Sequence, residues 1–158
     1  MKKMPAMLLL MGLFFGCSKS NNSATCTDVN PATEEPQIIS FAASNGITAT
    51  KDASGLYYQI INPGTTPMPD INDTVSVTYT GKFIDGTIFA QSGSTPITSA
   101  VSGFIEGWKI GLQKIAKGGQ IKLVIPSSLA YGCQGYYTIP PNAILYFDLT
   151  ITEVIQVP

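Results

Sequence analysis

Alternation of apolar and polar residues, interrupted by glycine and proline, most constrains what this 158-residue chain can fold into. In residues 75–80, for example, Val75, Val77 and Tyr79 are separated by polar residues. Successive side chains of a strand point to opposite faces, so this spacing is typical of a half-buried β-strand. The segments predicted as strands are residues 56–61, 75–80, 87–89, 121–125 and 143–154.

Helical spacing occurs in one place among these strands. Ile105, Trp108, Leu112 and Ile115 recur at intervals of three or four residues, which predicts a short helix with one apolar face. The pair Asp85-Gly86 is typical of a tight hairpin turn, so neighbouring strands are expected to be antiparallel. The pattern predicts an α+β fold, an antiparallel sheet with a short helix lying across it.

A further helix is predicted ahead of the sheet, from about residue 33 to residue 45. Thr33 can cap it, Glu34 and Glu35 suit its first turn, and Asn45-Gly46 suits a left-handed end. Apolar residues within 38–42 form one face of this helix. We expect that face to pack inside the molecule, and the chain to be a monomer.

Composition excludes several kinds of function. All nine basic residues are lysine, and the chain contains no histidine and no arginine. It cannot build a Ser-His-Asp or Cys-His nucleophile system or use a histidine metal ligand. It also lacks the arginine fork that grips phosphate or guanine. We therefore expect no metal, no cofactor and no nucleic-acid partner.

The N-terminus is predicted to be a targeting segment. Lys2 and Lys3 precede an apolar run at 4–16, which is too short to span a bilayer. Cys17 and a polar stretch follow, as in a bacterial lipoprotein signal. This predicts a signal peptide at 1–16, lipidation of Cys17, a lipid tether or linker at 17–32, and membrane anchoring in the cell envelope, on the periplasmic side of a Gram-negative cell. Plain secretion with an unmodified Cys17 is the alternative.

Two cysteines remain once Cys17 is assigned to lipid. In an exported protein, Cys26 and Cys133 would more often be bridged than free, so a disulfide between them is predicted. Two unconnected thiols are the alternative.

A series of motifs in residues 70–155 points to a known family. The motifs are VTYTG at 77–81, DGTIF at 85–89, IEGWKIGL at 105–112, KGG at 117–119, IP at 125–126, AYG at 130–132, IPPNA at 139–143 and LYFDL at 145–149. In order and spacing they resemble the FKBP-type peptidyl-prolyl isomerases. The resemblance implies a strongly twisted antiparallel sheet half-rolled around a short helix, and cis–trans isomerisation of Xaa-Pro bonds. It implies an isomerase domain at 62–158, preceded at 33–61 by the helix-plus-strand extension of some exported bacterial members.

The resemblance also implies a substrate pocket and its ligands. Trp108 would form the pocket floor, with Tyr79, Phe89 and Phe147 as walls, and the Tyr131 hydroxyl would meet the substrate backbone. The residues implied in substrate binding alone are Ile97, Phe104, Ile105 (through its backbone N–H) and Ile139. From periodicity alone, the aromatic residues are equally consistent with ordinary core positions. Proline-containing polypeptides, and macrolides of the type bound by the family, are the implied partners.

Two departures from the family pattern bear on activity. Many relatives carry aspartate where this chain has Ala90, which removes a carboxylate from the pocket rim. The loop at 133–139 is shorter than common and carries Tyr136-Tyr137, which are predicted either to reshape the pocket mouth or to be ordinary exposed residues. The leading hypothesis is an isomerase that assists folding of exported proteins. A catalytically weak binding module or chaperone, favoured by Ala90, is the second, and a purely structural envelope lipoprotein is the third.

Overall fold

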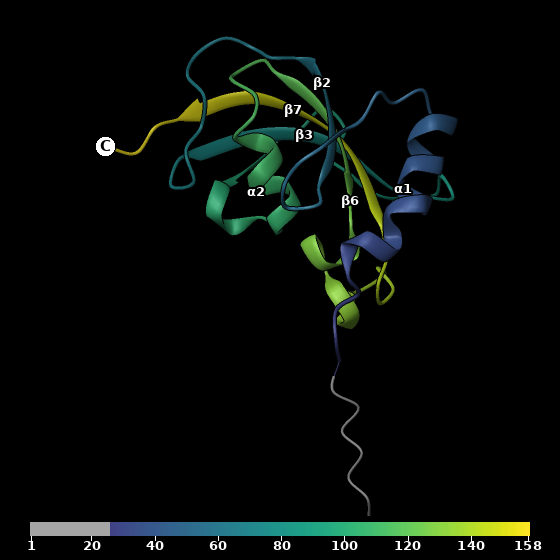
Figure 1. The fold of residues 1–158 in the computed structure, drawn as a ribbon. Helices are drawn as coiled ribbons and strands as arrows, with labels where there is room; N and C mark the ends of the chain where they lie inside the picture. The colour runs from purple at the N-terminus through teal and green to yellow at the C-terminus, as the bar shows by residue number, and fades with distance from the viewer. Residues whose placement is uncertain (1–25) are drawn as a thin grey trace, which may run out of the picture.

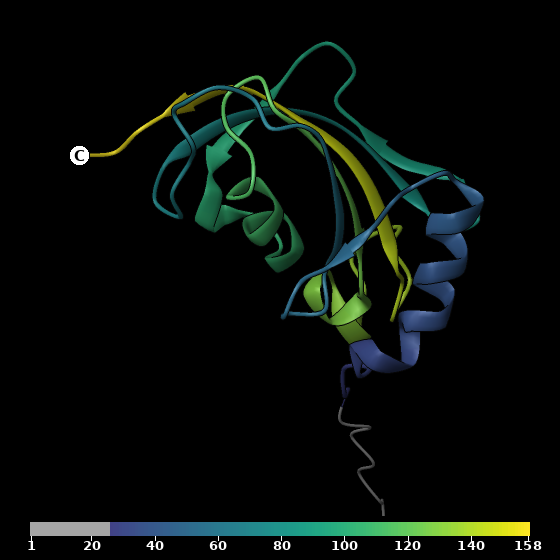
Figure 2. The same ribbon diagram turned by 45° about the horizontal axis from the view of Figure 1, so that its top comes forward.

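The computed structural model describes residues 26–158 as two α-helices on opposite sides of a curved sheet (Figures 1 and 2). The predicted signal peptide and Cys17 lie outside the described residues. The helices are α1 (Pro31–Ser44) and α2 (Glu106–Leu112). The strands are β1 (Thr50–Lys51), β2 (Tyr57–Asn62), β3 (Thr74–Phe83), β4 (Ile88–Gln91), β5 (Ile97–Ala100), β6 (Gln120–Ile125) and β7 (Leu145–Ile155). The 3₁₀ turns are η1 (Val101–Gly103), η2 (Ser127–Leu129) and η3 (Gly132–Gln134).

The strands form one seven-stranded antiparallel sheet in the order β1-β2-β6-β7-β3-β4, with β5 paired to β3. This confirms the predicted α+β fold. Two strands were not predicted: β1 has only two residues, and β5 contains the polar sequence Thr98-Ser99 and is largely exposed. Strand β2 runs through Asn62, across the predicted domain boundary, and pairs with β6. The extension and the rest of the chain therefore share one sheet.

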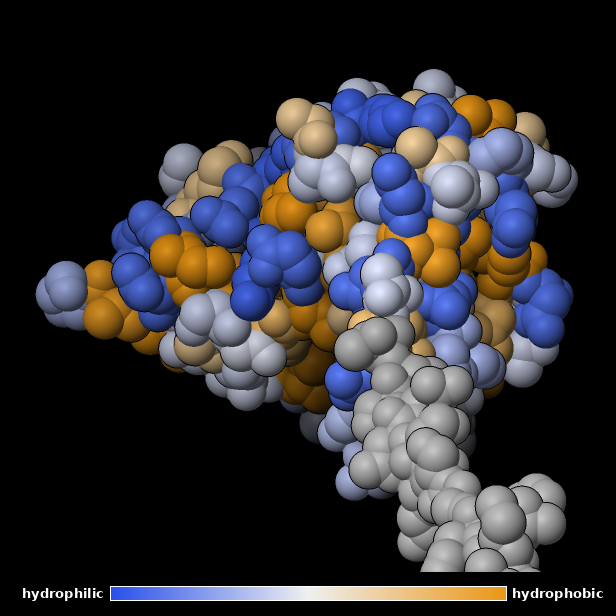
Figure 3. Space-filling view, turned by 60° about the horizontal axis from the view of Figure 1, so that its bottom comes forward, coloured by the Kyte–Doolittle hydropathy of each residue, from blue (hydrophilic) through white to orange (hydrophobic). Residues whose placement is uncertain are grey.

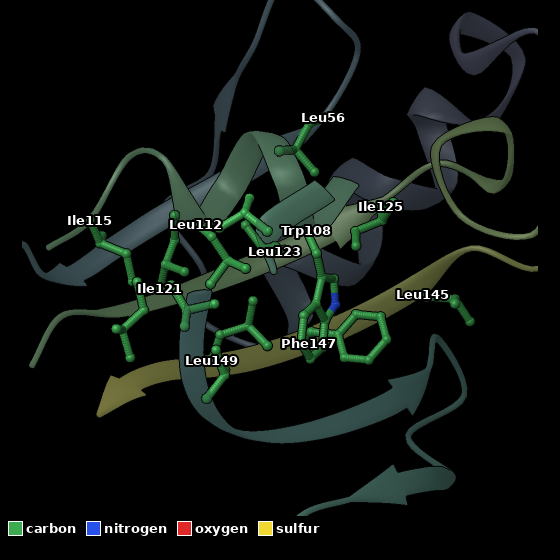
Figure 4. Packing of buried hydrophobic residues seen from close by; sticks show 14 of the residues in the cluster. Leu56, Trp108, Leu112, Ile115, Ile121, Leu123, Ile125, Leu145, Phe147 and Leu149 are labelled. Atoms are coloured by element: carbon green, nitrogen blue, oxygen red, sulfur yellow. The ribbon is translucent and has the colours of Figure 1, made fainter. Parts of the chain in front are cut away.

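The main core lies between α2 and the concave side of the sheet (Figure 4). Trp108, Leu112 and Ile115 are buried there, as their spacing predicts. Glycines let α2 approach β6 closely, because a Cβ atom at Gly111 would lie 2.7 Å from Cδ1 of Leu123. The helix is shorter than predicted: it ends at Leu112, and the N–H groups of Lys114 and Ile115 then donate to carbonyls three residues earlier.

Helix α1 covers the other side of the sheet through a second apolar cluster. Ile38, Phe41 and Ala42 are buried against residues of β2, β6 and β7. The helix begins at Pro31, two residues earlier than predicted, and its N-cap is Asn30 rather than Thr33. The Asn30 side chain accepts a hydrogen bond from the Ala32 N–H at 3.0 Å, and proline suits the first helical position.

The surface around the start of the described chain contains both hydrophobic and hydrophilic residues. Figure 3 shows hydrophobic residues there in separate groups among hydrophilic ones. Among residues 26–158, no helix combines the length and apolar character needed to cross a membrane.

An ion pair links the turn after β1 to the turn after α2. The Lys114 ammonium donates to Oδ2 of Asp52 at 2.7 Å, and the Ser54 N–H donates to the same carboxylate. These hydrogen bonds lower the pKa of Asp52 to about 2, and the bond from Lys114 contributes most.

The Asp52 carboxylate should make stability depend on pH. Its folded-state pKa lies below the value of about 3.9 expected in the unfolded chain, so its contribution is complete above that value and is lost as the pH falls towards 2. Asp52→Asn should lower the free energy of unfolding at neutral pH, and the difference from wild type should shrink below about pH 4. Urea unfolding across this range measures it, with Lys114→Met expected to show the same trend. A difference that is constant with pH would contradict the assignment.

Candidate functional site

A cavity of about 470 Å³ opens on the concave side of the sheet, beside α2. It is lined by all nine residues implied in catalysis or substrate binding: Tyr79, Phe89, Ile97, Phe104, Ile105, Trp108, Tyr131, Ile139 and Phe147. They come from β3, β4, β5, β7, α2 and the loops beside them. The fold thus gathers residues that are up to 68 positions apart in the sequence.

Trp108 lies at the centre of the aromatic lining and is only 4% exposed. Its ring meets Tyr79 and Phe147 edge to face, with centroids 5.2 Å and 5.1 Å away, and Phe104 at 5.0 Å. Figure 4 shows the indole beside the Phe147 ring. Edge-to-face pairs stabilise one another beyond simple burial, so these contacts favour the observed arrangement of the rings. Within the described residues, the buried indole Nε1 has no hydrogen-bond partner.

A glycine on β3 makes room for the aromatic wall. Gly81 pairs with Phe147 on β7, and a Cβ atom at residue 81 would lie 2.8 Å from both the Phe147 and Phe89 rings. Any larger residue at this position would have to displace these rings. The sequence carries this glycine within a family motif, but its role depends on a contact that the sequence alone does not reveal.

Tyr131 lies between η2 and η3 at the cavity mouth. It is half-buried, and its ring stacks on Tyr136 with centroids 5.1 Å apart and planes within 9°. Burial, with smaller contributions from Tyr136 and Tyr79, raises the pKa of the Tyr131 phenol. The hydroxyl therefore stays protonated at neutral pH and is able to donate a hydrogen bond.

The two tyrosines at the loop tip both line the cavity. Tyr136 and Ile139 exchange backbone hydrogen bonds of 2.9 and 2.8 Å, which makes a small hairpin with Tyr137 at its turn. Tyr137 is 92% exposed. Both predictions for this pair, a reshaped pocket mouth and ordinary exposed loop residues, stay predictions.

Comparison with known proteins identifies the family. Residues 66–152, which include all nine predicted pocket residues, match the family described as FKBP-type peptidyl-prolyl cis-trans isomerase. The chain belongs to this FKBP family. It is 42% identical over 120 residues to FkpA of Escherichia coli K12, covering 75% of this chain and 44% of that protein. It is 41% identical over 116 residues to a probable FkpA of Neisseria meningitidis serogroup B, covering 72% and 42%. The chain thus spans less than half the length of these curated relatives.

Solved structures agree with this assignment. The crystal structure of E. coli FkpA has a TM-score of 0.73 at 40% identity, and the match covers 82% of this chain and 61% of that one. A peptidyl-prolyl cis-trans isomerase from Pseudomonas syringae pv. tomato has a TM-score of 0.67 at 34% identity, covering 82% and 99%.

Ala90 directly follows Phe89 in the lining of this FKBP-family cavity. This residue on β4 pairs with Gly81 and lines the cavity, where its methyl group supplies no hydrogen-bond acceptor. Sequence reasoning missed two other lining residues as candidates, Gly103 and Thr138. The side chain of neither residue indicates a binding role. Gly103 lines the cavity because it lies in η1, and Thr138 because it lies at the loop tip.

The remaining cysteines are joined in the structure. Cys26 and Cys133 form a disulfide with Cα atoms 5.6 Å apart, across 107 residues of chain. Cys133 lies in η3, two residues after Tyr131. The start of the described chain is therefore covalently linked to the loop at the cavity mouth.

Proposed function

We propose that the chain is a peptidyl-prolyl cis-trans isomerase that assists the folding of exported proteins. The observation that carries the proposal is the apolar aromatic cavity floored by Trp108, with the Tyr131 phenol at its mouth. The family that residues 66–152 match is described as a peptidyl-prolyl cis-trans isomerase, which supports the same activity.

The chemistry of this reaction suits an apolar cavity. Rotation about an Xaa-Pro bond crosses a barrier of ~20 kcal/mol and transfers no proton or group. In the twisted transition state the amide has lost resonance, so its carbonyl and nitrogen are less polar than in the planar ground state. A dry aromatic cavity accommodates this species better than water does, and its shape can favour the twisted form. The reaction requires neither the histidine nor the arginine that the chain lacks.

Each part of the lining takes a role in this mechanism. Trp108 supports the prolyl ring, and Tyr79, Phe89 and Phe147 exclude water around it. Ile105 is the N-cap of α2, and a backbone N–H at this position makes no hydrogen bond within the helix. The Ile105 N–H is therefore proposed to bond a substrate carbonyl. The Tyr131 hydroxyl is proposed to donate to a second one. Macrolides of the family type would occupy the same cavity.

Loss of the Tyr131 hydroxyl should weaken catalysis. Tyr131→Phe keeps the ring and its stacking on Tyr136 but removes one donor, so kcat/KM should fall about 3- to 10-fold. A protease-coupled assay on a proline tetrapeptide measures it. Tyr58→Phe is the matched control, since Tyr58 packs over Lys114 away from the cavity and should keep wild-type activity. A wild-type rate equal to the uncatalysed one would reject the enzyme proposal.

Ala90 favours a second candidate, a catalytically weak binding module or chaperone with the same cavity. Restoring the rim carboxylate with Ala90→Asp should raise kcat/KM on the tetrapeptide or change macrolide affinity, because the acid supplies a polar partner for ligand or neighbouring side chains. Unchanged values for both would sink the idea that residue 90 limits turnover. Peptide binding without catalysis in wild type would support the module.

We further propose that the protein is exported and anchored to the envelope membrane through lipid on Cys17. The basic and apolar residues before Cys17 support this, and the Cys26–Cys133 disulfide suits an oxidising compartment. Mass spectrometry of protein purified from its native membranes should find an N-terminal acylated Cys17, and Cys17→Ser should release the chain from the membrane fraction. An unmodified Cys17 in the wild type would contradict anchoring.

Light scattering of detergent-free Cys17→Ser should give a monomer mass, as the intramolecular packing of α1 suggests.

A further inference from the structure

We propose that the N-terminal segment, residues 26–34, is a positioning element of the substrate cavity that holds Tyr131 in place. The proposal rests on the proposed isomerase function. Contacts from this segment reach the chain on both sides of Tyr131, at Ser127 and at Cys133. Figures 1 and 2 show the start of α1 beside the turns that carry this loop.

The contact before Tyr131 is a buried hydrogen bond. The backbone N–H of Ser127 donates to Oε2 of Glu34 at 2.8 Å; Ser127 is fully buried and Glu34 is 6% exposed. A carboxylate acceptor makes this bond stronger than a neutral one. Removing a carboxylate from such a site would leave a buried donor without a partner, which is destabilising. Glu34 thus fixes η2, four residues before Tyr131.

The contacts after Tyr131 meet at Cys133. The Cys133 N–H donates to Oδ1 of Asp28 at 2.9 Å, and its sulfur is bonded to Cys26. Gly132, which lies between Tyr131 and Cys133, has a left-handed φ of 56°. Any Cβ atom at residue 132 would overlap the Asp28 carboxylate. The loop backbone is therefore closely fitted to the N-terminal segment at this point.

The segment also lies along the second half of the same loop. Val29 and Thr33 line a hollow together with Pro140 and Asn142, and the Asn142 N–H donates to the Gly132 carbonyl at 2.8 Å. The segment therefore faces the second half of the loop across this hollow, and that half is hydrogen-bonded back to Gly132.

The other end of this connection is anchored independently of the cavity. Helix α1 is held on the far side of the sheet by its buried apolar residues, and Glu35 bonds to the Tyr57 hydroxyl and to Lys51. The N-terminal segment is thus a strut between the sheet and the loop. Ordering a loose loop during substrate binding would cost affinity, and a loop that is already held avoids that cost.

Neighbouring glutamates on α1 provide a matched test. Glu34 and Glu35 both dock the start of the helix, but only Glu34 reaches the loop of Tyr131. In the full chain, Glu34→Ala should lower kcat/KM on the tetrapeptide about five-fold, mainly through a higher KM, whereas Glu35→Ala should stay within about two-fold of wild type. Glu34→Gln, whose amide oxygen can accept the same bond, should recover most of the activity.

Amide hydrogen exchange gives a readout that does not depend on catalysis. Exchange in residues 128–137 should rise about ten-fold in Glu34→Ala and remain unchanged in Glu35→Ala, even where both variants lose similar thermal stability. Equal effects of the two variants would make Glu34 a general anchor of α1 and overturn the proposal. A loosened 128–137 segment with unchanged KM would overturn it as well.

The disulfide tests the same strut from its other attachment, without disturbing the buried carboxylate. Cys26→Ser should lower kcat/KM about two- to three-fold. Dithiothreitol, which reduces the disulfide to two thiols and is itself oxidised to a cyclic disulfide, should bring wild type to that level and leave Cys26→Ser unchanged. Insensitivity of wild type to reduction would count against the strut.

Failure of the proposed function would be seen separately. If wild type does not catalyse isomerisation, that function is rejected. Tetrapeptide binding, followed through the fluorescence of Trp108, the single tryptophan, then replaces KM in the comparison of Glu34→Ala with Glu35→Ala. Weaker binding in Glu34→Ala alone would support the strut, and equal binding would overturn it.

Discussion

The long antiparallel ladder between β3 and β7 is the interaction on which the rest of the structure depends. Its register runs from Thr74 opposite Ile155 to Phe83 opposite Leu145, with a bulge after Ser76. One face of the ladder supplies fully buried residues such as Val77 and Leu149 to the core. The same pairing sets Gly81 opposite Phe147, so register alone decides where the aromatic wall stands. A slip of one residue would turn the apolar side chains of the slipped strand to the wrong face.

The cavity is a consequence of incomplete coverage of that sheet. Helix α2 has only seven residues, and its glycines bring it close to β6, leaving the concave surface over β3, β4 and β7 to aromatic rings. Because Trp108 projects from the helix into this region, it belongs to the core and to the cavity at once. The two interpretations of Trp108, core residue and pocket floor, are therefore compatible. Close packing in the core restricts the position of the ring, and a site that selects by shape requires such restriction.

The sequence was sufficient for the sheet and for the helix with Trp108, because period-two and helical spacing reflect burial directly. It was insufficient for β1 and β5, whose short or polar sequences carry no such signal. The pocket residues came from the ordered family motifs; periodicity would have assigned Tyr79 and Phe147 to the core. Glu34 shows the limit best. In sequence it is an acidic residue suited to a first helical turn, yet its partner lies 93 residues away in a buried turn.

The N-terminal segment also changes how the chain divides into parts. The boundary predicted from the sequence falls at residue 62, and the family match begins at residue 66. Physically the boundary is weak, because β2 completes the sheet, α1 covers it, and residues 26–34 reach the loop beside the cavity. A loop at a cavity mouth has few neighbours of its own, so its order must come from whatever packs behind it. Here that support comes from residues 26–34, which lie outside the family match.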